Sequence, residues 1–164
     1  MRSPSDKMKI NIITVGKIKE KYLKDAIDEY KKRLSKFCSL NIIEVNESVA
    51  KVENDSNIKK SLEEEAQSII SKIRSEYVIV LDIDGKEFST IEVSEKIKEI
   101  TLKGVSEISF IIGGSYGLDN SIKKRADFRL SFSKLTFPHQ LFRVILLEQI
   151  YRVFKIINNE PYHK

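Results

Sequence analysis

The side chains best suited to chemistry lie in the last third of this 164-residue chain. His139 and Arg143 are four residues apart, so on a helix they share one face near its amino-terminal end. An arginine neighbour and a helix amino terminus both disfavour a charged imidazole, and a neutral histidine can accept a proton. The other histidine, His163, follows Tyr162 in a short tail. A lone histidine is more often structural than catalytic, and a tail is usually frayed unless it docks on a partner.

Two loops that could bind a ligand precede these side chains. A glycine turn, G-G-S-Y-G at residues 113–117, leaves one apolar strand, and the loop S-F-S-K-L-T-F follows the next strand. In the second loop Ser131, Ser133 and Thr136 bracket Lys134, and exposed backbone groups of such a loop can read an adenine edge. The alternative is that these hydroxyls cap the following helix. The glycine turn matches neither the dinucleotide fingerprint nor the P-loop, so it indicates only that backbone can approach a flat ligand closely.

Composition indicates one globular domain. The chain is 41% hydrophobic and 32% charged, and its length is sufficient for one core. No apolar run approaches the roughly 20 residues of a membrane span, and no secretory signal is visible. Residues 1–7 are interpreted as a remnant of recombinant expression, with Met8 opening a single domain at 8–164. The single cysteine, Cys38, excludes an internal disulfide and suits a reducing cytoplasm, and no cysteine or histidine cluster predicts a metal site.

Positive charge is concentrated where these candidate residues lie. Residues 121–164 hold nine basic and three acidic residues, a net charge of +6, and because the whole chain carries +5 the first 120 residues carry −1. A basic end on a nearly neutral domain suits a polyanionic partner such as RNA. A solvated lysine-rich surface is the alternative, so charge alone leaves the partner open.

Hydrophobic periodicity predicts strands that alternate with helices. The predicted strands are 9–15, 40–45, 77–83, 108–112 and 128–132, and the predicted helices are 21–36, 58–73, 93–100, 120–125 and 138–157. This alternation predicts an α/β fold with a mainly parallel sheet and helices on both faces. Ligands of such sheets bind beyond the carboxyl ends of the strands, so the turns at 81–85, 113–118 and 132–137 are expected to line one crevice.

The last predicted helix is apolar over most of its circumference. Leu146, Leu147, Ile150 and Phe154 fall on one face, whereas Ile145 lies nearly opposite. A helix of this kind is buried on more than one side. We therefore expect a homodimer in which a second subunit covers the helix, with a central core helix as the alternative.

Four motifs together closely resemble those of one family. They are the G-G-S-Y-G-L turn, the L-S-F-S-K-L-T-F-P-H-Q-L-F-R run, the E-Q-I-Y-R sequence and the terminal P-Y-H-K. They are similar to the motifs of the bacterial large-subunit (23S) rRNA pseudouridine N3-methyltransferases of the SPOUT superfamily, firmicute and staphylococcal members above all. The resemblance covers 8–164 and implies a trefoil-knotted α/β fold, a cytoplasmic homodimer and S-adenosyl-L-methionine bound in the knot. It also implies methyl transfer to N3 of a pseudouridine in helix 69 of 23S rRNA within the assembled ribosome.

The same resemblance implies roles for individual residues, and it implies no metal. The cofactor positions that it implies are Leu81, Gly113, Phe132, Ser133, Lys134, Leu135, Thr136 and Phe137. The catalytic positions that it implies are His139, Arg143, Tyr162 and His163, with the tail serving the pocket of the other subunit. Tyr116 occupies a position where some members have asparagine, which we expect to be tolerated.

The chemistry of such a reaction makes modest demands on the protein. N3 of a uracil-like ring is a poor nucleophile until its proton leaves, and His139 or His163 could take that proton while Arg143 stabilises the developing oxyanion. The sulfonium of the donor is itself a good electrophile, so positioning and deprotonation are sufficient. Two alternatives stay open. One is a nucleotide-sensing module without catalysis, and the other is a knotted methyltransferase for another RNA position, such as a ribose 2′-hydroxyl.

Overall fold

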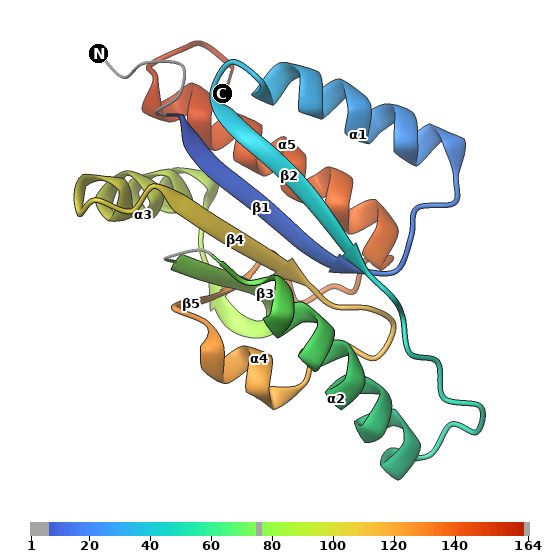
Figure 1. The fold of residues 1–164 in the computed structure, drawn as a ribbon. Helices are drawn as coiled ribbons and strands as arrows, with labels where there is room; N and C mark the ends of the chain where they lie inside the picture. The colour runs from blue at the N-terminus through green and yellow to red at the C-terminus, as the bar shows by residue number, and fades with distance from the viewer. Residues whose placement is uncertain (1–6, 75–76, 163–164) are drawn as a thin grey trace.

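A five-stranded parallel sheet forms the centre of the molecule (Figure 1). The computed structural model describes residues 7–74 and 77–162. The strands are β1 (Met8–Val15), β2 (Cys38–Val45), β3 (Tyr77–Glu87), β4 (Glu107–Ile112) and β5 (Phe128–Ser131), and they lie in the order β2-β1-β4-β3-β5. Each pair of neighbouring strands is parallel. The predicted α/β class is confirmed, because helical crossovers between successive strands are what parallel pairing requires.

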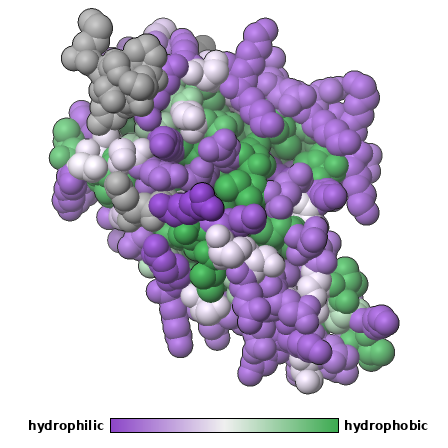
Figure 2. All heavy atoms as spheres, viewed as in Figure 1, coloured by the Kyte–Doolittle hydropathy of each residue, from purple (hydrophilic) through white to green (hydrophobic). Residues whose placement is uncertain are grey.

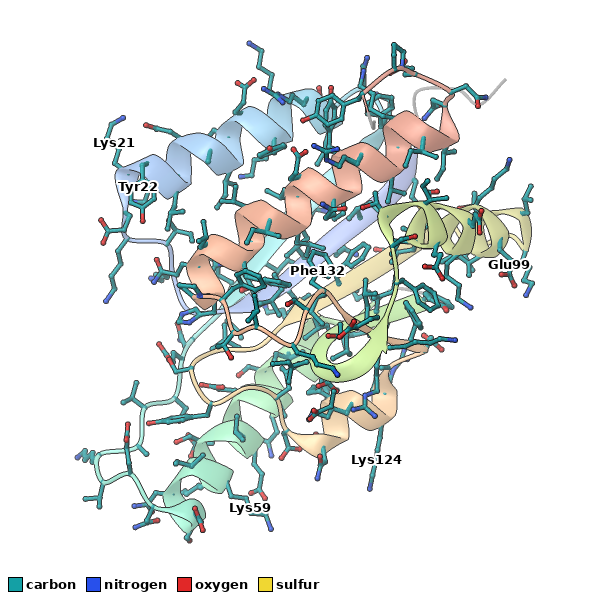
Figure 3. The ribbon with its side chains drawn as sticks, turned by 180° about the vertical axis from the view of Figure 1, so that it is seen from behind. Lys21, Tyr22, Lys59, Glu99, Lys124 and Phe132 are labelled. Carbon is teal, nitrogen blue, oxygen red and sulfur yellow. The ribbon has the colours of Figure 1, made fainter. Side chains whose placement is uncertain are left out.

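Helices cover both faces of the sheet, as the alternation predicts. The helices α1 (Lys21–Leu34), α3 (Thr90–Leu102) and α5 (His139–Ile157) pack on one face, and α2 (Asp55–Lys72) and α4 (Asn120–Arg125) pack on the other (Figure 1). On the first face α5 lies between α1 and α3 and contacts both of them (Figure 3). The sheet is therefore the middle of three layers, with a separate apolar core on each side.

Consecutive residues of the central strands enter different cores. In β4 the side chain of Phe110 packs towards α5, whereas that of Ile111 packs towards α2 and α4, and both are fully buried. In β1 the neighbours Ile12 and Ile13 divide in the same way. Burial on both faces explains why these strands are rich in apolar residues and do not alternate strictly between apolar and polar residues.

Side-chain caps place the first residues of three helices, α2, α3 and α4. Asp119 accepts a hydrogen bond from the backbone N–H of Ser121 at 3.0 Å, and α4 has both of its predicted ends. Asn54 accepts one from the backbone N–H of Asn57 at 2.8 Å, and α2 therefore begins at Asp55, three residues before its first predicted apolar position. The periodic pattern locates the apolar stripe of α2, but the polar cap determines where the helix starts.

The sequence Asp84-Gly85 interrupts β3 but does not end it, contrary to the prediction. Pairing between β3 and β5 breaks after Leu81 and resumes at Lys86, so residues 82–85 form a bulge. A Cβ on Gly85 would lie only 2.7 Å from a backbone oxygen of β5, which explains the glycine at this close approach. The bulge at Asp84-Gly85 therefore changes the direction of the chain at the edge of the sheet where the loops after β4 and β5 also lie.

The outer faces of the helices are largely hydrophilic. Figure 2 shows mostly purple side chains over α1 and α2, with a green patch at the end of the molecule where the β2–α2 loop lies. Val49 and Val52 of that loop are well exposed. Among the helices of the described residues, none is long and apolar enough to cross a membrane.

Cys38 opens β2 and is 2% exposed. Burial raises the pKa of its thiol to about 12, and the Lys7 ammonium opposes this only weakly. We expect the folded protein to be inert to Ellman's reagent at neutral pH, because the thiolate is the reacting species. One thiol should react once the chain is unfolded in denaturant. A thiol that reacts in the folded protein as fast as free glutathione would contradict this placement.

Candidate functional site

A pocket of about 400 Å³ opens at the carboxyl ends of β3, β4 and β5. All three predicted strand-end turns contribute to it, as expected for a parallel sheet. Seven of the eight predicted cofactor positions line it, namely Leu81, Gly113, Phe132, Ser133, Leu135, Thr136 and Phe137. The eighth, Lys134, is exposed and is not part of the pocket wall. Figure 3 shows Phe132 near the middle of the view, between the start of α5 and the sheet.

The glycine turn forms one wall of this pocket by folding back on itself. The backbone N–H of Gly117 donates to the carbonyl of Gly114 at 3.1 Å, and Gly117 has a φ of +86°. A Cβ on Gly113 would lie 2.5 Å from the carbonyl oxygen of Gly117. Glycine is therefore required at 113 by the close approach of two backbone segments and favoured at 117 by its positive φ.

The loop that follows β5 is held by its own hydroxyls. Ser131 donates a hydrogen bond to the carbonyl of Ser133 at 3.1 Å, and the Ser133 hydroxyl accepts one from the backbone N–H of Leu135 at 2.9 Å. The alternative that these hydroxyls cap the following helix is wrong, because α5 begins after Pro138 without a side-chain cap. Phe132 and Phe137 flank this loop and line the pocket, and both rings pack against Phe142 of α5.

Asp82 supports the pocket from the base of the bulge in β3. Its carboxylate is buried and accepts two hydrogen bonds from Arg129 of β5, at 2.9 and 2.6 Å, and one from the backbone N–H of Asp84 at 3.0 Å. Lys123 lies 3.8 Å away. Burial alone would raise the pKa of Asp82, but the Asp84 N–H and the two cations outweigh burial and lower it. This contact joins the two strands that carry the first and third pocket segments.

We expect Asp82→Asn to lower the free energy of unfolding by about 1–3 kcal/mol at neutral pH, because Arg129 would lose its ionised partner. A lowered pKa in the folded state stabilises the protein above the unfolded-state pKa of about 3.9 and stops doing so as the pH falls through the folded-state value. The difference in unfolding free energy between wild type and variant should therefore become smaller in acid. Urea unfolding across this pH range measures it, with the exposed Asp28→Asn as matched control. A gap that is independent of pH would contradict an ionised Asp82.

His139 lies at the rim of the pocket, in the first turn of α5. Its Nε2 is 3.9 Å from the position that a Cβ would take on Gly16, the residue that follows β1. A carboxylate oxygen of Glu47 lies 3.8 Å from the same point. The imidazole is therefore placed between the pocket and the β1–α1 loop, with an acidic side chain close by.

Arg143 shares the helix face of His139, as predicted, but it is not on the pocket wall. Its side chain is 1% exposed, and its guanidinium donates to Glu44 at 2.6 Å and to the backbone carbonyls of Gly16 and Val15 at 2.8 and 3.4 Å. Its Nε has no hydrogen-bond partner among the described residues. Through these hydrogen bonds Arg143 holds the start of the β1–α1 loop in place next to His139.

The structure does not bring Tyr162 to His139 within one chain. Tyr162 donates to the carboxylate of Glu148 at 3.0 Å, and its ring packs edge-on against Tyr151 at 5.0 Å and beneath the Arg152 guanidinium at 4.8 Å. Glu148 is nine residues beyond His139, which is about 13 Å along the helix axis. The predicted tail residue His163 lies outside the described residues.

Two supporting residues, Glu44 and Asp82, were not found by sequence reasoning. Glu44 pairs with Arg143 across 99 positions of the chain, and Asp82 pairs with Arg129 across 47. A signal was present for each. An arginine on a helix predicted to be buried requires an acidic partner, and an aspartate that ends a continuously apolar strand requires a cation or N–H groups.

Comparison with known proteins identifies the family to which the chain belongs. A family profile described as "Predicted SPOUT methyltransferase" matches residues 8–163. The chain is 56% identical over 160 residues to the ribosomal RNA large subunit methyltransferase H of Finegoldia magna and 51% identical over 161 residues to that of Clostridium acetobutylicum, covering 96% of this chain and 100% of each relative. A solved "probable methylase family protein" from Haemophilus influenzae shares the fold, with a TM-score of 0.54 and 15% identity over 94% of this chain and 70% of that one. The chain therefore belongs to the SPOUT methyltransferase family, as its four motifs predicted.

Proposed function

We propose that this protein transfers a methyl group from S-adenosyl-L-methionine to N3 of a pseudouridine in helix 69 of 23S rRNA, within the assembled ribosome. The observation that carries the proposal is the meeting of three strand-end segments in one pocket beside His139. The relatives from Finegoldia magna and Clostridium acetobutylicum are named ribosomal RNA large subunit methyltransferases, which supports rRNA as the substrate class.

The pocket suits the proposed cofactor in size and in chemistry. A volume of about 400 Å³ lies within the usual range of small-molecule sites. Leu81, Phe132 and Phe137 offer apolar surface to a purine, and the glycine turn at Gly113 lets backbone approach it closely. When bound, the cofactor supplies an electrophilic methyl group on a sulfonium centre. The residues proposed to hold it are Leu81, Gly113, Phe132, Ser133, Leu135, Thr136 and Phe137, together with the backbone of Lys134.

His139 is the base that we propose for the substrate. Removal of the proton from N3, which is flanked by two carbonyl groups, turns a poor nucleophile into a good one. The imidazole of His139 lines the pocket, where it can accept that proton. Since Arg143 is buried and paired with Glu44, its proposed role is to position the β1–α1 loop against His139, in place of the direct contact with an oxyanion expected from the sequence. His163 is the alternative base, acting from the partner subunit.

A homodimer with a trefoil-knotted chain completes the proposal. The outward side of α5 carries Leu141, which is 38% exposed, and the half-buried Ile145, an apolar surface that a second copy could cover. Because Tyr162 lies far along α5 from His139 in its own chain, a tail that takes part in catalysis would serve the pocket of the partner. A ribosomal substrate implies a cytoplasmic enzyme.

Transfer of labelled methyl groups tests the function. We expect label from S-adenosylmethionine to enter the large-subunit rRNA of ribosomes that lack the modification. A non-catalytic binding module would retain the cofactor in equilibrium dialysis yet transfer no label. If the protein did not bind S-adenosyl-L-methionine at all, the assignment of the pocket as the cofactor site would also be wrong.

A further inference from the structure

We propose that a lysine rim at the start of α1 grips the phosphate backbone of the RNA substrate and sets it beside His139. The lysine rim comprises Lys17, Lys19, Lys21, Lys24 and Tyr22, and all five side chains are exposed. The inference rests on the proposed function, because it specifies how the substrate of that same site is held.

The lysine rim begins at the edge of the pocket. Gly16, directly before it, lies beside His139, whose Nε2 is 3.9 Å from the position of a Cβ on that glycine. The preceding residue, Val15, packs against the glycine turn, since a Cβ on Gly114 would lie 3.0 Å from Val15 Cγ1. Figure 3 shows Lys21 and Tyr22 at the outer end of α1, on the side of the molecule where α5 begins. An RNA strand lying on the rim would thus pass the proposed base.

One ion pair, between the buried Arg143 and the exposed Glu44, fixes the loop that carries the first two lysines. The carboxylate of Glu44 accepts from the Arg143 guanidinium at 2.6 Å and from the backbone N–H of Ile18 at 3.2 Å. The same guanidinium donates to the carbonyl of Gly16 at 2.8 Å. The backbone is thus held on both sides of Lys17, and a preorganised loop loses less conformational entropy when it binds.

The charges and the ring on the rim suit single-stranded or looped RNA. Lys21 is engaged by Asp25 at 2.7 Å, but within the described residues no carboxylate lies at ion-pair distance from Lys17 or Lys19. Unpaired ammonium groups are available to phosphates, and contacts of that kind make affinity depend steeply on salt. Tyr22 is 68% exposed beside them, and an exposed ring can stack on an unpaired base.

The test compares two double variants that remove equal charge. Lys17→Gln/Lys19→Gln alters the rim, and Lys32→Gln/Lys98→Gln removes two exposed lysines at the far end of α1 and on α3. Binding to ribosomes that lack the modification is measured over a range of salt concentrations. We expect the plot of log affinity against log salt to become shallower by roughly 1.5 for the rim variant, because each phosphate contact contributes about 0.7–0.9 to the slope. The control variant should keep the wild-type slope.

Equal slopes for the two variants would overturn the proposal. Tyr22→Ala should lower kcat/KM at least roughly fivefold through the loss of stacking, whereas Tyr22→Phe keeps the ring and the rate. Equal rates for Tyr22→Ala and wild type would show that Tyr22 does not stack on the RNA. The rim proposal and the proposed function can fail separately. If the wild-type enzyme methylates rRNA but the rim variant keeps the wild-type salt slope, only the rim proposal is wrong. Cofactor binding, measured on every variant, should not change.

Discussion

Replacing Gly113 with alanine is expected to weaken S-adenosylmethionine binding roughly 10- to 100-fold, because forcing an extra atom into a packed site costs about 1–3 kcal/mol. The new Cβ would lie 2.5 Å from the carbonyl oxygen of Gly117 and 2.9 Å from Leu118 Cγ, so the glycine turn must move. Because that turn is one wall of the pocket, its movement changes the surface that meets the cofactor. Isothermal titration calorimetry of wild type and variant measures the effect.

Gly104→Ala is the matched control for this substitution. Gly104 follows α3, away from the pocket, and a Cβ there would meet no atom within 4 Å, although its φ is +99°. The control should lose about 1 kcal/mol of stability through its backbone conformation and keep wild-type cofactor affinity. If Gly113→Ala binds the cofactor as tightly as the control does, the glycine turn is not part of the cofactor site.

Replacing His139 with asparagine is expected to slow methyl transfer roughly 100- to 10,000-fold while the cofactor affinity changes little. The imidazole is the proposed acceptor of the N3 proton, and an asparagine amide cannot take a proton. Single-turnover transfer to ribosomes measures the rate directly.

Two further variants separate His139 from its surroundings. Gln140→Ala alters the next residue of the same helical turn, which does not line the pocket, and should keep the wild-type rate. His163→Asn tests the alternative base in the tail. A His139→Asn enzyme that keeps the wild-type rate, together with a His163→Asn enzyme that has lost it, would assign the proton transfer to the tail of the partner subunit.

The sequence predicts well what short-range patterns determine. The apolar runs of β1 and β4 mark strands buried on both faces, and Asp119 marks the start of α4 through a contact only two residues away. The pocket is also predictable, since parallel strands place their carboxyl-end turns at one edge. The family motifs then indicate which side chains of those turns belong to the site, and the profile match confirms the family.

Contacts between distant segments are what sequence patterns miss. The sequence Asp84-Gly85 predicts the end of a strand, but β3 pairs with β5 again beyond it, and residues 82–85 form a bulge. The spacing from His139 predicts that Arg143 faces the substrate. Instead, Arg143 is buried and pairs with the carboxylate of Glu44, which is 99 positions away in the chain. In both cases a partner that is remote in the chain overrides a local signal, and periodicity contains no information about that partner.

The most direct test of the proposed activity is the position of the transferred methyl group in the rRNA. Ribosomes that lack the modification are incubated with the enzyme and S-adenosylmethionine, and the rRNA is then digested and mapped by mass spectrometry. We predict one added methyl on the base of a pseudouridine in helix 69, at N3. A methyl on a ribose 2′-hydroxyl, or on a base elsewhere in the rRNA, would contradict the proposed reaction while leaving the family and the fold intact.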